Sequence, residues 1–294
     1  MNGLVTRIAE RVPWAITNLT LAPIYFLHIP KTAGSSVSFW LKDQIGKNHT
    51  CGAGNWDELI RIERSELRKC RLFCGHFGVD LKRFLHRSLR TVSILRDPVQ
   101  RTISHYHHVH RDTYHPRHRR VVRETLDEFV RNPDNWPMID NFQARYLVQT
   151  PVNITNSSGP FDRSDSKAGQ LSVLSEEARF LLDPGYVREK SREVIERDIS
   201  VVGTTEQLLQ FLSSVAREFM LPLPRPEDVP FINVSPLPAS DVQVASETRD
   251  IIRELTPIDQ ELWNSCQRRG HADAICHAAA TKTAPMDYTA PSAG

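Results

Sequence analysis

The fold is most visible in one segment, Ile24-Tyr-Phe-Leu-His-Ile-Pro-Lys-Thr-Ala-Gly-Ser-Ser36. Its apolar part over 24–28 lies between two prolines and is typical of a buried strand. A turn that contains Gly34 follows, and apolar residues at helical spacing predict a helix over 35–44. Backbone N–H groups at the start of such a helix attract anions, and the helix dipole adds to this attraction. The segment therefore predicts a P-loop-like strand, loop and helix that binds phosphate.

The side chains of this loop suit a phosphate ligand. Lys31 supplies a positive charge, and three residues of the loop supply hydroxyls. A Walker A loop has another order, because its lysine follows its glycines, whereas Lys31 precedes Gly34. We expect phosphate contacts from the residues of the loop, which are Lys31, Thr32, Ala33, Gly34, Ser35 and Ser36.

A second phosphate site is predicted in Thr91-Val-Ser-Ile-Leu-Arg-Asp-Pro-Val-Gln-Arg-Thr-Ile-Ser-His-Tyr106. Arg96 follows a strand expected over 91–95, and ligands of open α/β sheets bind at that end of the strands. Its guanidinium can hold a phosphate through two parallel bonds, and Ser104 in the next helix can add a hydroxyl. Asp97 is a poor magnesium ligand, because the neighbouring arginine competes for its carboxylate.

Apolar runs and helical patterns alternate along the rest of the chain. Two further strands are expected over 72–75 and 200–203. Helices are expected near 56–67, 98–110, 125–131, 141–149, 188–197, 206–220 and 256–269, and a loop over 151–170. Short apolar strands that alternate with helices predict an α/β fold, a three-layer sandwich with a central parallel sheet. We expect one domain over 20–270, an N-terminal extension over 1–19 and a disordered tail over 271–294.

The composition excludes several classes of protein. Apolar residues make up 40% of the 294-residue chain and charged residues 24%, which excludes wholesale disorder. The net charge of +2 is low for a protein that binds a nucleic acid polymer, so none is expected as a partner. No run of about 18 apolar residues is present, so we expect no transmembrane segment.

Cysteines and glycosylation sequons point to different compartments. Five cysteines without a second pair at metal-ligand spacing favour reduced thiols and no structural zinc. The first 20 residues do not resemble a signal peptide, because charges and Pro13 interrupt their apolar part. We therefore expect a cytoplasmic protein. The alternative is the lumenal domain of a Golgi-type enzyme, favoured by N-x-S/T sequons at Asn18, Asn48, Asn153, Asn156 and Asn233.

The two phosphate segments together resemble the sulfotransferases that use 3′-phosphoadenosine 5′-phosphosulfate (PAPS). The segment 29–36 is similar to the family's 5′-phosphosulfate loop, and 96–106 is similar to its 3′-phosphate site. Within the family, the chain resembles the glycan branch, the heparan and uronyl 2-O-sulfotransferase type. The likeness extends to 73–77, 141–145, 201–206 and 258–263.

The resemblance implies a reaction and roles for particular residues. PAPS would be the co-substrate, 3′-phosphoadenosine 5′-phosphate (PAP) the product, and no metal would be needed. His76, in Phe73-Cys-Gly-His-Phe77, would be the catalytic base, a role that suits the ordinary pKa of histidine, and Lys31 would act beside it. Asn233 and Ser235 lie in a loop similar to one that covers the nucleotide, so they are further candidates for cofactor contacts.

A stretch rich in histidine and arginine runs from His105 to Arg123, and three interpretations of it stay open. Histidine pairs such as His107 and His110 could bind a metal, although no carboxylate or cysteine joins them at fixed spacing. The stretch could also be a solvated helix face. As a third possibility, it forms a basic wall that attracts an acidic acceptor. On that reading the substrate-binding residues are Arg117, Arg119 and Arg120.

The resemblance thus implies an O-sulfotransferase that moves the sulfuryl group from PAPS to a hydroxyl of a carbohydrate. An acidic polysaccharide is the candidate acceptor that the basic stretch favours. A small-molecule alcohol or phenol is the alternative acceptor. More remote alternatives are a nucleotide-dependent kinase and a non-catalytic module that binds nucleotide or glycan. The missing Walker A order argues against the kinase.

Overall fold

The computed structural model describes residues 22–148, 180–229 and 244–268. Several predictions fall outside these ranges: the extension over 1–19, the loop over 151–170, the tail over 271–294, and the cofactor contacts of Asn233 and Ser235.

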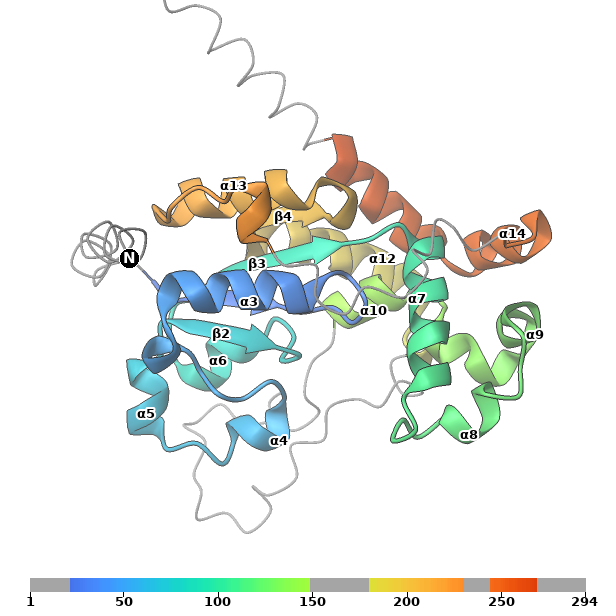
Figure 1. Cartoon of the computed structure of the whole chain (residues 1–294), viewed down its shortest axis with the longest axis horizontal. Helices are drawn as coiled ribbons and strands as arrows, with labels where there is room; N and C mark the ends of the chain where they lie inside the picture. Colours follow the sequence, from blue (N-terminus) through green and yellow to red (C-terminus); the bar gives the residue numbers. More distant parts are fainter. Residues whose placement is uncertain (1–21, 149–179, 230–243, 269–294) are drawn as a thin grey trace, which may run out of the picture.

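Within the described ranges, four parallel strands form one sheet with the order β2-β1-β3-β4 (Figure 1). The strands are β1 (Ile24–Leu27), β2 (Leu72–Gly75), β3 (Arg90–Leu95) and β4 (Ile199–Thr204). The predicted α/β class and the parallel sheet are confirmed. Because the strands run in the same direction, the residues that follow them emerge at one edge. Leu27 lies beside Gly75 on one side and beside Ser93 on the other.

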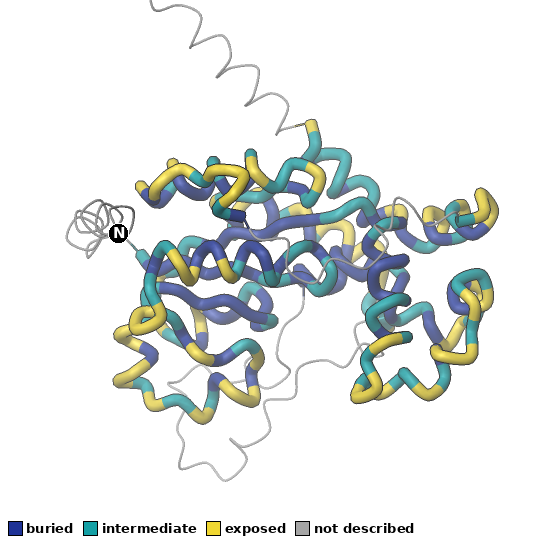
Figure 2. The backbone as a smooth tube through the Cα atoms, viewed as in Figure 1, coloured by how far each residue is buried: buried dark blue, intermediate teal, exposed yellow. Residues whose placement is uncertain are grey.

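Alternation along the strands divides the core between the two faces of the sheet. Ile24 and Phe26 pack with α3 (Gly34–Ile45) and α13 (Leu208–Phe219). Tyr25 and Leu27 point the other way and pack with helices that include α10 (Phe142–Leu147) and α12 (Pro184–Glu193). Helices therefore cover both faces, and β1, β2 and β3 are buried between them, whereas β4 at the edge of the sheet is only partly buried (Figure 2).

A third apolar cluster holds a group of helices beyond the edge of the sheet (Figure 1). This group comprises α7 (Pro98–Arg111), α8 (His118–Val121), α9 (Leu126–Arg131) and α14 (Ser246–Leu255). Thr125 and Glu128 form a capping box at the start of α9. Since α7 begins directly after β3, it links the sheet edge to this group.

The helix expected over 56–67 is wrong as a single element. The chain forms α4 (Trp56–Leu59) and α5 (Arg64–Lys69) with a turn between them. Ile60 and Ile62 both pack against the core, and one continuous helix cannot direct two residues at this spacing to the same side. The turn therefore lets both isoleucines pack against the core, where they are partly buried.

Other boundaries differ from the predictions by a few residues, and some short elements were not expected. The helix predicted over 188–197 starts earlier, because Asp183 caps it and Pro184 occupies its first position. A helix over 257–268 ends the described chain. Additional elements are α6 (Leu81–Leu85), the 3₁₀ turns η1 (Lys47–His49), η2 (Pro133–Met138), η4 (Thr205–Gln207) and η5 (Pro226–Asp228), and a π turn, η3 (Val194–Asp198).

Candidate functional site

The turn between β1 and α3 has an unusual backbone. Lys31 and Ala33 adopt positive φ angles of 71° and 60°. Left-handed residues in such a turn tilt successive backbone N–H groups toward one side, which is the geometry of an anion-binding nest. The hydroxyl of Thr32 donates to the carbonyl of Ile29 at 2.9 Å, so it closes the turn from inside. The first turn of α3 carries no acidic side chain that would compete for an anion.

Gly34 is required at the start of α3 because of His28. A Cβ atom at Gly34 would lie 1.8 Å from Nε2 of His28, far inside contact distance. The imidazole of His28 thus packs directly under the turn. No site role was predicted for His28. The residue directly follows β1, at the sheet edge where ligands of α/β proteins bind, and this position could have marked it as a site residue.

His76 follows β2 and lies against His28, which packs under the turn. Its Nδ1 is 2.7 Å from the carbonyl oxygen of His28. A carbonyl only accepts hydrogen bonds, so Nδ1 carries the proton and Nε2 keeps the lone pair. The imidazole stacks on that of His28 with ring centroids 4.5 Å apart, and Tyr146 contacts it edge-on at 5.8 Å. These contacts fix the tautomer and the plane of the His76 ring.

His28 remains uncharged beside His76. Burial lowers the pKa of His28 to about 3, together with the charge that His76 would carry when protonated and the charge of Lys31. At neutral pH His28 therefore adds no positive charge to the site. Its carbonyl orients His76, and its ring separates His76 from Gly34.

Arg96 brings the two predicted phosphate segments into contact. Its Nη1 donates to the carbonyl of Lys31 at 3.2 Å. The side chain of Gln143 holds the backbone of Arg96 on both sides: the Arg96 N–H donates to Oε1 at 2.9 Å, and Nε2 donates to the Arg96 carbonyl at 2.9 Å. Burial lowers the pKa of Arg96. The strand end that carries this arginine is therefore fixed from α10.

A buried carboxylate in turn holds Gln143. Asp259 accepts hydrogen bonds from the backbone N–H groups of Gln143, at 3.0 Å, and Ala144, at 2.7 Å. Burial raises the pKa of Asp259 to about 6. Gln143 and Asp259 lie in the segments 141–145 and 258–263 of the resemblance, but no role was predicted for either residue. Their contact joins residues 116 positions apart, which local patterns do not predict.

Positive charge concentrates around Lys31. Burial and the neighbouring guanidinium groups of Arg111, Arg96 and Arg101, in that order, lower the pKa of Lys31 to about 8. His105 and His108 also lie within the electrostatic reach of Lys31, and burial lowers the pKa of each. Such a cluster favours an anion, because an anion would relieve the repulsion between its members.

The remaining residues of the second phosphate segment have different surroundings. Ser104 is buried on α7. Asp97 caps α7 by accepting from the backbone N–H of Gln100 at 2.8 Å. Arg101 is buried, donates to the carbonyl of Met138, and lies 4.2 Å from the centre of the Phe142 ring. The hydroxyl of Tyr106 donates to the carbonyl of Glu124 at 2.8 Å. Arg101 and Tyr106 thus join α7 to its neighbouring helices.

The basic stretch contributes less exposed charge than its composition suggests. Arg117 donates to the carbonyl of Asp134 at 2.8 Å, and Arg120 donates to the same carbonyl at 3.1 Å. Both arginines therefore tie α8 to η2. Arg119 is exposed. Among the described residues, no group of three or more histidine, cysteine, aspartate or glutamate side chains could hold a metal ion.

We expect Arg119→Gln to raise the KM for an acidic polysaccharide about 1.5- to 5-fold, the scale of one exposed charge pair. The effect should shrink at high salt, because exposed charges act over about a Debye length, ~10 Å at 0.1 M salt. Initial rates at several salt concentrations measure it. Arg68→Gln, on exposed α5, is the matched control. An unchanged KM at low salt would favour the interpretation that Arg119 belongs to a solvated helix face without a role in binding.

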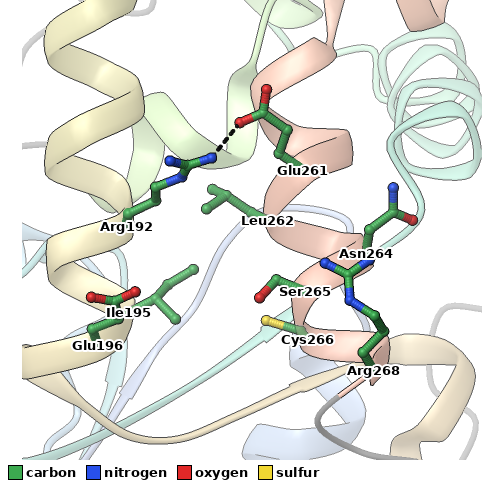
Figure 3. Close-up of a pocket in the computed structure, with 9 residues that line it drawn as sticks. All are labelled: Arg192, Ile195, Glu196, Glu261, Leu262, Asn264, Ser265, Cys266 and Arg268. Atoms are coloured by element: carbon green, nitrogen blue, oxygen red, sulfur yellow. Dashed lines mark hydrogen bonds and ion pairs between the residues drawn. The ribbon is translucent and has the colours of Figure 1, made fainter.

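A cavity of about 470 Å³ lies elsewhere, between α12 with η3 and the helix over 257–268 (Figure 3). Arg192 bridges part of it to Glu261 at 3.0 Å. Its walls are formed by Arg192, Ile195, Glu196, Glu261, Leu262, Asn264, Ser265, Cys266 and Arg268. None of the residues predicted to bind substrate or cofactor lines this cavity.

Comparisons with known proteins give no assignment: no protein-family model matches the chain, and no curated protein matches it. In the described ranges, every helix is too short or too polar to cross a lipid bilayer.

Proposed function

We propose that this protein is a PAPS-dependent O-sulfotransferase that transfers a sulfuryl group to a hydroxyl of a carbohydrate. The observation that carries the proposal is the 2.7 Å contact from Nδ1 of His76 to the carbonyl of His28. It leaves Nε2 as the basic nitrogen of a histidine that stacks on His28, the residue that follows β1 and packs against the turn bearing Lys31. A base and an anion-binding turn at one sheet edge are what transfer of a charged group to a hydroxyl requires.

In this proposal, the turn from Lys31 to Ser36 is P-loop-like and binds the 5′-phosphosulfate. The two positive φ angles and the start of α3 support this role, because both direct backbone N–H groups toward an anion. Lys31 adds a positive charge that can stay paired with the leaving phosphate. The cluster of cations around Lys31 supports an anion of more than one negative charge.

Arg96, with Ser104, binds the 3′-phosphate in this proposal. The hydrogen bond from Arg96 to the carbonyl of Lys31 supports it, because one nucleotide must reach both phosphate positions. Gln143 supports the same role by holding the backbone of Arg96. The guanidinium is thereby oriented before the ligand arrives, which reduces the entropy lost on binding.

The reaction is an in-line displacement at sulfur. Nε2 of His76 takes the proton of the acceptor hydroxyl as the oxygen attacks. The new O–S bond forms while the bond from sulfur to the phosphate oxygen breaks, and PAP departs with that electron pair. Lys31 and the N–H groups of the turn stabilise the charge that grows on the departing phosphate. The proton on His76 is then released to solvent.

A turnover assay with sulfur-labelled PAPS tests the proposal against a panel of acidic glycans, neutral glycans and phenols. We expect label in a glycan. Label in a phenol would make the protein a small-molecule sulfotransferase. Binding of ATP with magnesium, together with no binding of PAP, would overturn the proposal in favour of a kinase. Binding of PAP without transfer to any acceptor would favour a non-catalytic module.

The rate should depend on pH through Lys31. Because the pKa of Lys31 is lowered to about 8, the free enzyme loses this positive charge as the pH rises past that value. We expect kcat/KM for PAPS to fall about tenfold per pH unit at higher pH. In Lys31→Arg the decline should move to higher pH, because a guanidinium stays protonated.

Lys31→Ala separates a catalytic role from simple binding. We expect kcat to fall more than PAP affinity, because the lysine acts mainly on charge that develops in the transition state. Calorimetric binding of PAP, measured beside the rate, gives both quantities. Equal losses in rate and affinity, or an unchanged alkaline decline in Lys31→Arg, would contradict this role.

A further inference from the structure

Cys51 and Cys70 come together at the start of β2. The extended segment around Thr50 pairs in parallel with Leu72, and the Cys51 N–H donates to the Leu72 carbonyl at 2.8 Å. The two thiols lie close enough for Cys70 to hydrogen-bond a Cys51 thiolate, and both side chains pack against the same apolar cluster. The Cys70 thiol also donates to the carbonyl of Glu66 at 3.5 Å. Cys51 is buried, whereas Cys70 is half-buried and reaches solvent.

Two hydrogen bonds from Arg87 hold the backbone around Cys70. Arg87 donates through Nη1 to the carbonyls of Arg68 and Cys70, both at 3.0 Å, which fixes the end of α5.

Cys74 is not an alternative partner. It lies on β2 among the residues that pack under α3, on the opposite face of the sheet from Cys51.

The two thiols differ in their acidity. The hydrogen bond from Cys70 holds the pKa of Cys51 below its usual value, because Cys70 can donate to a Cys51 thiolate. The same contact and burial raise the pKa of Cys70. Cys70 is the more accessible sulfur of the pair, and Cys51 lies deeper in the core.

We propose that Cys51 and Cys70 form a dithiol–disulfide pair that is oxidised by low-molecular-weight disulfides. A small disulfide first exchanges with the accessible Cys70, which gives a mixed disulfide and releases one small thiol. The Cys51 thiolate then attacks the Cys70 sulfur and releases the second. The protein loses two electrons and two protons, and the oxidant becomes two thiols, so the exchange balances. Because Cys51 lies beside Cys70, the second step is intramolecular, and the mixed disulfide does not accumulate.

Oxidation would close a loop that touches the candidate base. The segment between the two cysteines contains Gly54, whose carbonyl accepts from the His76 N–H at 2.8 Å. It also contains Trp56, whose indole donates to the Phe77 carbonyl at 3.1 Å. A disulfide between Cys51 and Cys70 would therefore constrain the segment whose hydrogen bonds hold the backbone of His76 and Phe77. The pairing itself does not depend on the proposed sulfotransferase activity.

The test uses the full chain, reduced, desalted and incubated with oxidised glutathione, then alkylated and digested with trypsin without reduction. Trypsin separates Cys51, Cys70 and Cys74 into the fragments 48–61, 70–71 and 72–82. We expect fragment 48–61 joined to 70–71, and two fewer alkylated thiols per chain. Cys51→Ser should instead accumulate glutathione on Cys70, because the resolving thiol is missing. Cys74→Ala is the matched control and should still form the bond.

Three outcomes would overturn the proposal. One is fragment 70–71 joined to 72–82, which would make Cys74 the partner. Another is stable glutathione on Cys70 in the unaltered chain, which would mean that Cys51 does not resolve it. The last is alkylation of both Cys51 and Cys70 after incubation with the oxidant. Because every readout is a mass, none of these results depends on whether the protein transfers sulfate.

Discussion

His76→Ala should lower turnover by roughly 10²-fold or more, the usual scale for a general base, while PAP affinity stays unchanged. The reason is the orientation of the ring. The carbonyl of His28 accepts from Nδ1 at 2.7 Å, which leaves Nε2 as the nitrogen that can take a proton. Alanine removes that nitrogen but leaves the phosphate contacts of the turn in place. Single-turnover rates at saturating acceptor, together with calorimetric binding of PAP, measure the two quantities.

A second substitution separates the chemistry of His76 from its packing. His76→Gln can still donate an amide N–H to the carbonyl of His28, but it has no basic nitrogen. We expect it to be about as inactive as the alanine variant. His49→Ala, an exposed histidine on η1, is the matched control and should keep full activity. Near wild-type turnover in either His76 variant would contradict the assignment of His76 as the general base.

Arg96→Ala should remove most of the preference for PAP over AMP. The two nucleotides differ only in the 3′-phosphate. A charge-assisted hydrogen bond contributes roughly 1.5–3 kcal/mol, and a bidentate one more. Each ~1.4 kcal/mol is tenfold, so the wild type should prefer PAP by at least about two orders of magnitude. In Arg96→Ala we expect PAP affinity to fall toward that of AMP, with AMP affinity almost unchanged. Calorimetric titration of both nucleotides measures this.

Two further variants grade this effect. Ser104→Ala should weaken PAP in the same selective way, but less, because a neutral hydroxyl contributes less than a guanidinium. Gln143→Leu leaves Arg96 in the chain but removes the two bonds to its backbone, so we expect an intermediate and equally selective loss. If PAP and AMP lose affinity equally in Arg96→Ala, this arginine supports the turn at Lys31 instead of the 3′-phosphate.

The elements of the fold were largely predictable from local sequence. The strand at 72–75 matches its prediction, and the strands at 91–95 and 200–203 differ from theirs by about one residue at an end. The strands β1, β2 and β3 are buried on both faces, so each appears as a short continuous apolar run. The prediction over 56–67 was wrong because a periodic pattern does not reveal that Ile60 and Ile62 both pack against the core.

The contacts of the candidate site were only partly predictable. Lys31 and Arg96 were singled out from their positions after strands, and the structure joins them through one hydrogen bond of 3.2 Å. No role was predicted for His28, because it acts through its carbonyl, which orients His76, and through the packing of its ring against Gly34, and not through a charge. Arg117 and Arg120 looked like free surface charge, yet both bind the carbonyl of Asp134.

Local sequence was enough to predict the parallel α/β sheet and the edge at which polar residues follow the strands. Both depend on neighbours in the chain, because apolar runs form strands and the shared direction of the strands brings their ends together. The orientation of the residues at that edge depends instead on contacts between distant parts of the chain. The tautomer of His76 depends on a carbonyl 48 positions away, and the backbone of Arg96 depends on Gln143, 47 positions away. Hydrogen bonds over such separations form because packing brings distant strands and helices together, and no local pattern encodes their geometry.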